Sequence, residues 1–137
     1  MAEPPDVLMR RVTEEIWNGR RLDRIDELVS EQFVDHVDLP VTPAGGRNRY
    51  RASVEAMHAA FPDYHEEIEF VVADADRAAS YVTLTGTHEG ELYGLPPTGK
   101  RVEYHSIGIL RFEDGNVVER WGIGDSMTMM GQLGLLG

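Results

Sequence analysis

The sequence predicts a single α+β domain in which three helices precede a curved, mainly antiparallel sheet. Up to residue 61, apolar residues recur every three or four positions, as on one face of a helix. After residue 65, apolar and polar residues alternate in several segments, as in strands with one buried face. The pair Asp114-Gly115 lies between two β-rich segments, where Asp-Gly is typical of a hairpin turn. Helices followed by a sheet indicate an α+β architecture.

The helices are expected at residues 5–17, 23–29 and 47–60. In the first, Leu8, Val12 and Ile16 repeat every four positions and form an apolar stripe, and Asn18-Gly19 ends the helix. The third carries the same kind of stripe and stops before Pro62. These stripes predict helices with one face on the sheet.

The strands are expected at residues 33–39, 66–72, 80–88, 101–112 and 116–123. In the second, Ile68, Phe70 and Val72 alternate with glutamates and are expected to face the core. Apolar residues occupy both faces of 101–112, which predicts that helices cover one face and either a second subunit or a loop covers the other. A homodimer is the simpler explanation. A last short helix through Met130 is expected, with Asp125 as its cap.

Composition excludes several classes of protein. The 137 residues, 42% of them hydrophobic, suit one domain over residues 1–137. The net charge of −11 and the scattered basic residues argue against nucleic acid or an anionic membrane as a partner. Cysteine is absent, which rules out disulfides and thiolate chemistry. Without an apolar run of membrane-spanning length or the apolar centre of a signal peptide, a cytoplasmic location is expected.

A curved sheet covered by helices predicts an apolar cavity with a few polar groups directed into it. His36 and Asp38 are expected to share a strand face, where the carboxylate could orient the imidazole for acid/base catalysis. Asp125, at the end of the last strand, is the other catalytic candidate. The other residues expected to line the cavity are Trp17, Phe61, His88, Tyr93, Tyr104, Ser106, Arg120 and Trp121.

Other chemistries receive little support from the sequence. The histidines show no HExxH or close helical pairing, so no metal site is predicted. The turn GELYGLPPTGK matches no nucleotide-binding motif, and a GxSxG elbow is absent. Proton transfer or water activation in an apolar cavity, without a cofactor, is the chemistry that remains.

Several segments carry a resemblance to a known family: EEIWNGRRLDRIDELVSEQFVDH, AAFPD, TGTHEGELYGLPPTGK, ILRFEDGNVVERW and the terminal GQLG. In order and spacing they resemble the SnoaL-like polyketide cyclases, which have the cone-shaped fold that also houses ketosteroid isomerase. The resemblance implies a cone-shaped α+β barrel. It also implies a small hydrophobic ligand, polyketide- or terpenoid-like, and chemistry without metal or organic cofactor.

In such cyclases a histidine and an aspartate on the last two strands act as acid/base. Aligned on the PPTG turn and the DG hairpin, these positions fall on Gly108 and Gly122, and neither glycine can transfer a proton. Trp17 and Ser53 fall where the cyclases carry a pocket tyrosine and asparagine, which implies that both contact substrate.

Two hypotheses follow. In the first, the protein is a cyclase, isomerase or hydrolase whose acid/base function has moved to His36 with Asp38, or to Asp125. In the second, the two glycines enlarge the pocket of a protein that binds a hydrophobic molecule without converting it.

Overall fold

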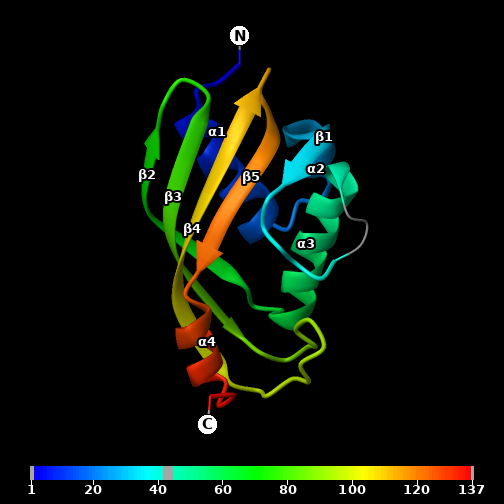
Figure 1. Ribbon diagram of the computed structural model, residues 1–137, viewed down its shortest axis with the longest axis vertical. Helices are drawn as coiled ribbons and strands as arrows, with labels where there is room; N and C mark the ends of the chain where they lie inside the picture. Colours follow the sequence, from blue (N-terminus) through cyan, green and yellow to red (C-terminus); the bar gives the residue numbers. More distant parts are fainter. Residues whose placement is uncertain (1, 42–44, 137) are drawn as a thin grey trace.

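The computed structural model describes residues 2–41 and 45–136 and confirms the α+β fold (Figure 1). The helices are α1 (Pro5–Arg11), α2 (Asp23–Leu28), α3 (Gly46–Ala60) and α4 (Ser126–Gln132), and the π-helical segment η1 (Val12–Asn18) continues α1. The strands are β1 (Val29–Asp35), β2 (His65–Ala73), β3 (Arg77–Thr87), β4 (Arg101–Glu113) and β5 (Asn116–Gly124). All the expected elements are therefore present, with shifted ends.

The strands form one sheet in the order β1-β5-β4-β3-β2. Neighbours pair antiparallel except β1 and β5, which are parallel, so the sheet is mixed. The β4–β5 hairpin turns at Asp114 and Gly115, both with positive φ, as the Asp-Gly pair predicts. Figure 1 shows α1 across one face of the sheet and α3 beside β1. The cone-shaped outline stays a prediction.

The first strand lies earlier in the chain than predicted. It ends at Asp35, and the following segment leaves the sheet after the backbone N–H of His36 donates to the Arg120 carbonyl at 2.8 Å. Arg49 then holds this segment by donating to the carbonyls of Val37 and Val41 at 2.7 and 3.5 Å. The expectation that His36 and Asp38 share a strand face is therefore wrong.

A second difference concerns β2. Its pairing with β3 is irregular between Ile68 and Phe70, as at a β-bulge, which changes the face that later residues occupy. Phe70 and Val72 are consequently 54% and 59% exposed, whereas Val71 packs against the core. The prediction that Phe70 and Val72 face the core is wrong, and Ile68 alone of the three packs there.

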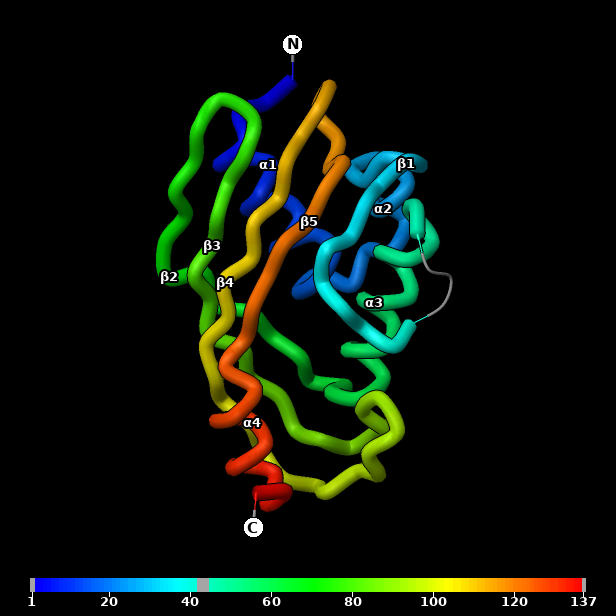
Figure 2. Tube along the Cα trace, in the orientation of Figure 1, coloured from blue at the N-terminus to red at the C-terminus, as the bar shows by residue number. Residues whose placement is uncertain are grey.

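Two clusters of buried apolar residues fill the space between helices and sheet. One joins α1, η1, α2, β1 and α3 around Ile16, Phe33 and Val54. The other gathers around Phe61, Val102 and Leu133 at the opposite end of the molecule. Trp17 packs against both clusters. The turn after β3 closes the second end, where the N–H groups of Glu89 and Gly90 donate to the carbonyl of Ala60 at the end of α3 (Figure 2).

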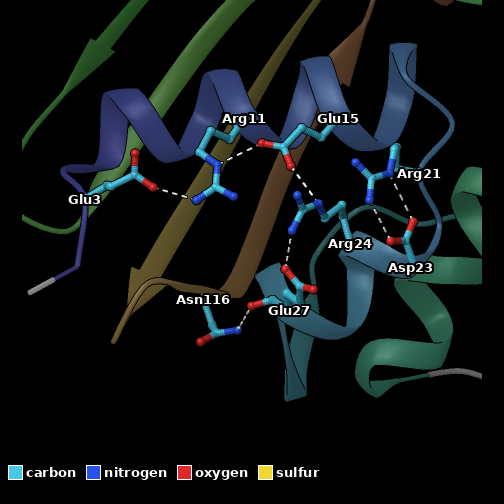
Figure 3. A network of polar contacts seen from close by, with 8 residues as sticks. All are labelled: Glu3, Arg11, Glu15, Arg21, Asp23, Arg24, Glu27 and Asn116. Carbon is cyan, nitrogen blue, oxygen red and sulfur yellow. Dashed lines mark hydrogen bonds and ion pairs between the residues drawn. The ribbon is translucent and has the colours of Figure 1, made fainter.

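Ion pairs join the N-terminal helices on the outside of this core (Figure 3). Glu15 lies between two guanidiniums, at 2.8 Å from Arg11 Nε and 3.0 Å from Arg24 Nε. Arg11 also contacts Glu3, and Arg24 contacts Glu27. The network links η1 to α2 and to the segment before α1. None of the described helices is long and apolar enough to cross a membrane.

Candidate functional site

A cavity of about 460 Å³ lies between the helices and the sheet, where the two apolar clusters meet. Its helical side is formed by α1, η1, α3 and α4, and its sheet side by β2, β3, β4 and β5. Exposed residues such as Asp38, Pro40, Tyr93 and Ser126 also line it, so it reaches the surface there. Most other lining side chains are apolar, which suits a hydrophobic small molecule.

Glu66 is an ionisable group in this largely apolar space. It lies on β2 on the same side as Ile68, lines the cavity, and accepts a hydrogen bond from the Tyr64 hydroxyl at 2.9 Å. Burial raises the pKa of Glu66 to about 7, because it outweighs the opposing effects of the Tyr64 hydrogen bond and the Arg120 charge. A carboxyl group with a pKa near 7 can both accept and donate a proton at neutral pH.

Arg120 brings a positive charge to another part of the wall. Its Nε donates to Asp35 Oδ1 at 3.0 Å, and its Nη2 contacts both Asp35 Oδ2 and Ser53 Oγ. The guanidinium lies over the rings of Tyr50 and Phe33, at 5.0 and 5.6 Å from their centroids. Nη1 makes no hydrogen bond to a described residue, which leaves it available to a ligand oxygen.

The Asp35 carboxylate fixes this arginine. Its side chain is fully buried between Arg120 and Arg49, whose Nε donates at 3.0 Å. Burial raises the pKa of Asp35, but the hydrogen bonds from Arg120 and Val37 and the charges of the two arginines together lower it below the usual value. Two guanidiniums against one carboxylate leave a net positive charge beside the cavity.

Tyrosines supply the neutral polar groups of the wall. The Tyr50 hydroxyl accepts from the indole N–H of Trp17 at 2.9 Å, and burial raises the pKa of Tyr50 to about 12. Burial also raises the pKa of Tyr104 to about 12. Both phenols are therefore protonated at neutral pH and can donate hydrogen bonds to a ligand.

Eight of the residues predicted from the sequence line the cavity: Trp17, Asp38, Ser53, Tyr93, Tyr104, Ser106, Arg120 and Trp121. They come from η1, α3, β4, β5 and the two loops that follow β1 and β3. Asp38 is exposed where the cavity reaches the surface.

Four predicted residues lie outside the cavity lining. His36 is exposed, stacks on Trp121 at 5.0 Å between ring centroids, and contacts Glu119 Oε2 at 2.6 Å. Asp125 is exposed and caps α4, accepting from the N–H and hydroxyl of Thr128 at 3.1 and 2.6 Å. This confirms its predicted capping role. Neither of these side chains lines the cavity.

Phe61 and His88 are buried in the core beside the cavity rather than in its wall. Their rings contact each other, with centroids 5.6 Å apart. His88 Nδ1 accepts from the Thr98 backbone N–H at 3.3 Å and also lies 3.1 Å from the Thr98 hydroxyl. Through these contacts with Thr98, His88 stabilises the turn between β3 and β4. The expectation that both residues line the cavity is wrong.

Sequence reasoning missed Glu66, Tyr64, Asp35 and Arg49. The signal for Glu66 is in the sequence, because alternation places it on the same face as Ile68, two residues away. An ionisable residue on the apolar face of a strand is unusual enough to indicate a site.

Helices packed on one face of a mixed sheet, with a carboxyl group and a guanidinium in the wall of an apolar cavity, define a small α+β protein with an internal pocket. A model of the SnoaL-like polyketide cyclase family matches residues 7–133. The chain belongs to this family.

Individual known proteins are similar to this chain over most of its length. Aklanonic acid methyl ester cyclase DnrD of Streptomyces peucetius is 28% identical over 130 residues, which cover 93% of this chain and 88% of the relative. The solved structure of AclR from Streptomyces galilaeus is 33% identical, with a TM-score of 0.79, over 96% of this chain and 85% of that one. IdmH from Streptomyces antibioticus is 29% identical, with a TM-score of 0.80, over 96% and 99%.

Proposed function

We propose that this protein binds a hydrophobic, polyketide-like ketone in the cavity and catalyses proton transfer on it without a cofactor, in a reaction of the ring-closing kind. The observation that carries the proposal is Glu66, a carboxyl group with a pKa of about 7 in an apolar cavity. Relatives named as cyclases of aklanonic and nogalonic acid methyl esters support the substrate class.

In this proposal Glu66 acts as the base. Its carboxylate removes a proton from a carbon next to a carbonyl group, and the electron pair moves to the carbonyl oxygen to form an enolate. Arg120, held by Asp35, stabilises the negative oxygen through its charge and its unused Nη1 donors. The enolate carbon attacks a second carbonyl of the same molecule, and protonated Glu66 returns the proton to the resulting alkoxide. The cavity supplies the alignment of the two reacting carbons.

Other lining residues have binding roles in this proposal. Trp17, Tyr93 and Trp121 contact the rings of the ligand, whereas Ser53 and Tyr104 offer hydroxyls to its oxygens. Asp38, at the surface end of the cavity, takes part in ligand entry rather than in proton transfer. The alternative function is a protein that binds the same kind of molecule without converting it, which the room over Gly108 favours.

The test uses aklanonic acid methyl ester in deuterated buffer. Mass spectrometry follows deuterium uptake next to the carbonyls, and chromatography follows the ring-closed product. Glu66→Gln should slow both by about 10²–10⁴-fold, the usual contribution of a general base. Glu67→Gln, at an exposed neighbour, should change neither rate. In the native protein the rate should rise with pH through about 7, as Glu66 loses its proton.

Two results would count against the enzyme. Full activity in Glu66→Gln would remove this residue from the mechanism. Tight binding of the ester with no exchange or product in the native protein would favour the binding function instead.

We also propose a homodimer formed through an exposed apolar row on the sheet, two members of which, Ile107 and Ile123, also border the cavity. Phe70, Tyr81, Ile107 and Ile123 are cross-strand partners in one row over β2, β3, β4 and β5. Three of them are at least 42% exposed. On the same sheet the Arg111–Glu119 pair carries both signs of charge, so a second copy related by a two-fold axis could match apolar row to apolar row and arginine to glutamate.

A further inference from the structure

Two glycines within strands differ in what surrounds them. A Cβ atom on Gly86 of β3 would lie 2.9 Å from the Phe61 Cβ, so packing against Phe61 requires glycine there. A Cβ on Gly108 of β4 would have no described neighbour closer than 4.0 Å, where Met9 Cε and Ser80 Oγ lie. Gly108 is not among the glycines with positive φ. Since glycine weakens a strand, its presence at Gly108 is unexplained by the packing of the protein itself.

Gly108 faces the cavity. It pairs with Ser80 on β3 and Gly122 on β5, and all three line the space together with Met9 and Val37. We call this part of the wall, formed by Met9, Val37, Ser80, Gly108 and Gly122, the Gly108 recess. Val37 bounds it on the β5 side, since a Cβ on Gly122 would lie 3.5 Å from a Val37 methyl group.

An unused hydroxyl borders the recess. Ser80 is only 5% exposed, yet its hydroxyl makes no hydrogen bond to any described residue. It lies 4.0 Å from the position that a Gly108 Cβ would occupy, on the cavity side of the sheet. The hydroxyl oxygen is accessible from the cavity rather than sealed in the core, so an oxygen atom of a bound molecule can pair with it.

We propose that the Gly108 recess is a specificity-determining subsite, which receives an oxygen-bearing ring edge of the ligand and binds that oxygen through Ser80. The inference rests on the proposed binding of a hydrophobic molecule, and it extends that proposal to the part of the ligand remote from proton transfer. Gly108, one of the two positions at which the family resemblance implies an acid/base residue, then provides space for the ring in this chain, and Ser80 binds the oxygen of that ring.

The binding test uses phenanthrene and 9-phenanthrol, which differ by one hydroxyl, in fluorescence titrations. The native protein should bind 9-phenanthrol about 5–10-fold more tightly, the usual effect of one hydrogen bond to a buried group. Ser80→Ala should abolish this preference and leave phenanthrene affinity within about two-fold. Gly108→Val should weaken both ligands by about ten-fold or more, because its branched side chain fills the recess.

Ser106→Ala is the matched control. Ser106 also lines the cavity, but its hydroxyl already donates to the Ile123 carbonyl at 3.3 Å. This variant should keep the preference for 9-phenanthrol. A preference that survives in Ser80→Ala, or disappears in Ser106→Ala alone, overturns the assignment of Ser80.

A second measurement needs no ligand. Gly108→Ala should leave the melting temperature unchanged or raise it by about 2–4 °C, because alanine fits the observed space and restricts the unfolded chain. Gly86→Ala should lower it by several degrees, because Phe61 must move. Equal destabilisation by both substitutions would mean that the fold itself requires Gly108, and the recess would lose its functional explanation.

The outcomes separate this inference from the proposed function. Failure of both phenanthrenes to bind the native protein would contradict hydrophobic binding and hence both proposals. A lost preference in Ser80→Ala, combined with full activity in Glu66→Gln, would support the subsite and contradict only the catalytic role of Glu66.

Discussion

The Asp35 carboxylate and the Arg120 guanidinium form a two-point ion pair, in which Nε donates to Oδ1 and Nη2 donates to Oδ2. The pair joins parallel neighbours, because Asp35 on β1 is the register partner of Arg120 on β5. The edge of the sheet thereby fixes a positive charge in the cavity wall.

Replacing Asp35 should be strongly destabilising. Asp35→Asn leaves the charges of Arg49 and Arg120 uncompensated in a buried place, which costs about 3–5 kcal/mol of unfolding free energy in comparable cases. Urea denaturation at pH 7 measures the loss. Asp23→Asn is the control, because its partner Arg21 and Asp23 itself are both largely exposed, and it should barely move the midpoint. Equal midpoints for the two variants would contradict a structural role for the Asp35–Arg120 pair.

The ion pairs of Glu15 shown in Figure 3 should contribute less to the free energy of unfolding than the Asp35–Arg120 pair. Glu15 is partly exposed, and the Arg11 hydrogen bond lowers the pKa of Glu15, outweighing burial. Glu15→Gln should therefore cost about 0.5–1 kcal/mol at pH 7. A folded-state pKa below the usual value means that this stabilisation is lost as pH falls through it. Glu14→Gln, at the exposed neighbour, should have little effect at any pH, and a larger loss there than at Glu15 would contradict the assignment.

The spacing of apolar residues predicted the helices and strands because this spacing depends on local backbone geometry. Apolar residues at every third or fourth position lie on one face of a helix. An Asp-Gly pair suits a hairpin turn because both central residues of that turn have positive φ. The β2 bulge shows the limit of this reasoning. One irregularity after Ile68 reverses the faces of Phe70 and Val72, and nothing in strict alternation marks where it occurs.

The residues that line the cavity could be predicted from the sequence more completely than the groups that carry the proposed chemistry. Trp17, Tyr104 and Arg120 could be placed in the cavity from strand and helix faces. His36 could not, because the chain leaves the sheet at a point fixed by the Arg49 side chain, a contact between distant segments. The face on which Glu66 lies could have been inferred from the sequence. Its pKa of about 7 could not, because it depends on burial by elements that only the folded structure brings together.

The proposed homodimer predicts that a charged substitution in its contact surface lowers the mass of the protein in solution. Ile123 is 75% exposed at the end of the row that includes Phe70 and Ile107. Ile123→Asp puts a charge into the proposed apolar contact, so light scattering after gel filtration should give the mass of one chain instead of two. Met127→Asp is the control, because Met127 is also 69% exposed but lies on α4. A native protein with the mass of one chain would rule out the dimer.

The raised pKa of Glu66 predicts an unusual dependence of stability on pH. The folded protein holds this proton up to about pH 7, whereas an unfolded glutamate releases it near 4.5, so folding takes up a proton between these values. Stability should therefore fall as pH rises from about 4.5 to 7. Glu66→Gln keeps an acceptor for the Tyr64 hydroxyl without a charge to bury, and should exceed the native protein at pH 8 by about 1–3 kcal/mol. The gain should shrink towards pH 5. Urea midpoints at both pH values measure it, with Glu67→Gln as the exposed control. A gain that is absent at pH 8, or equal at both pH values, would mean that burial does not raise the pKa of Glu66, and the case for this residue as a base at neutral pH would lose its physical foundation.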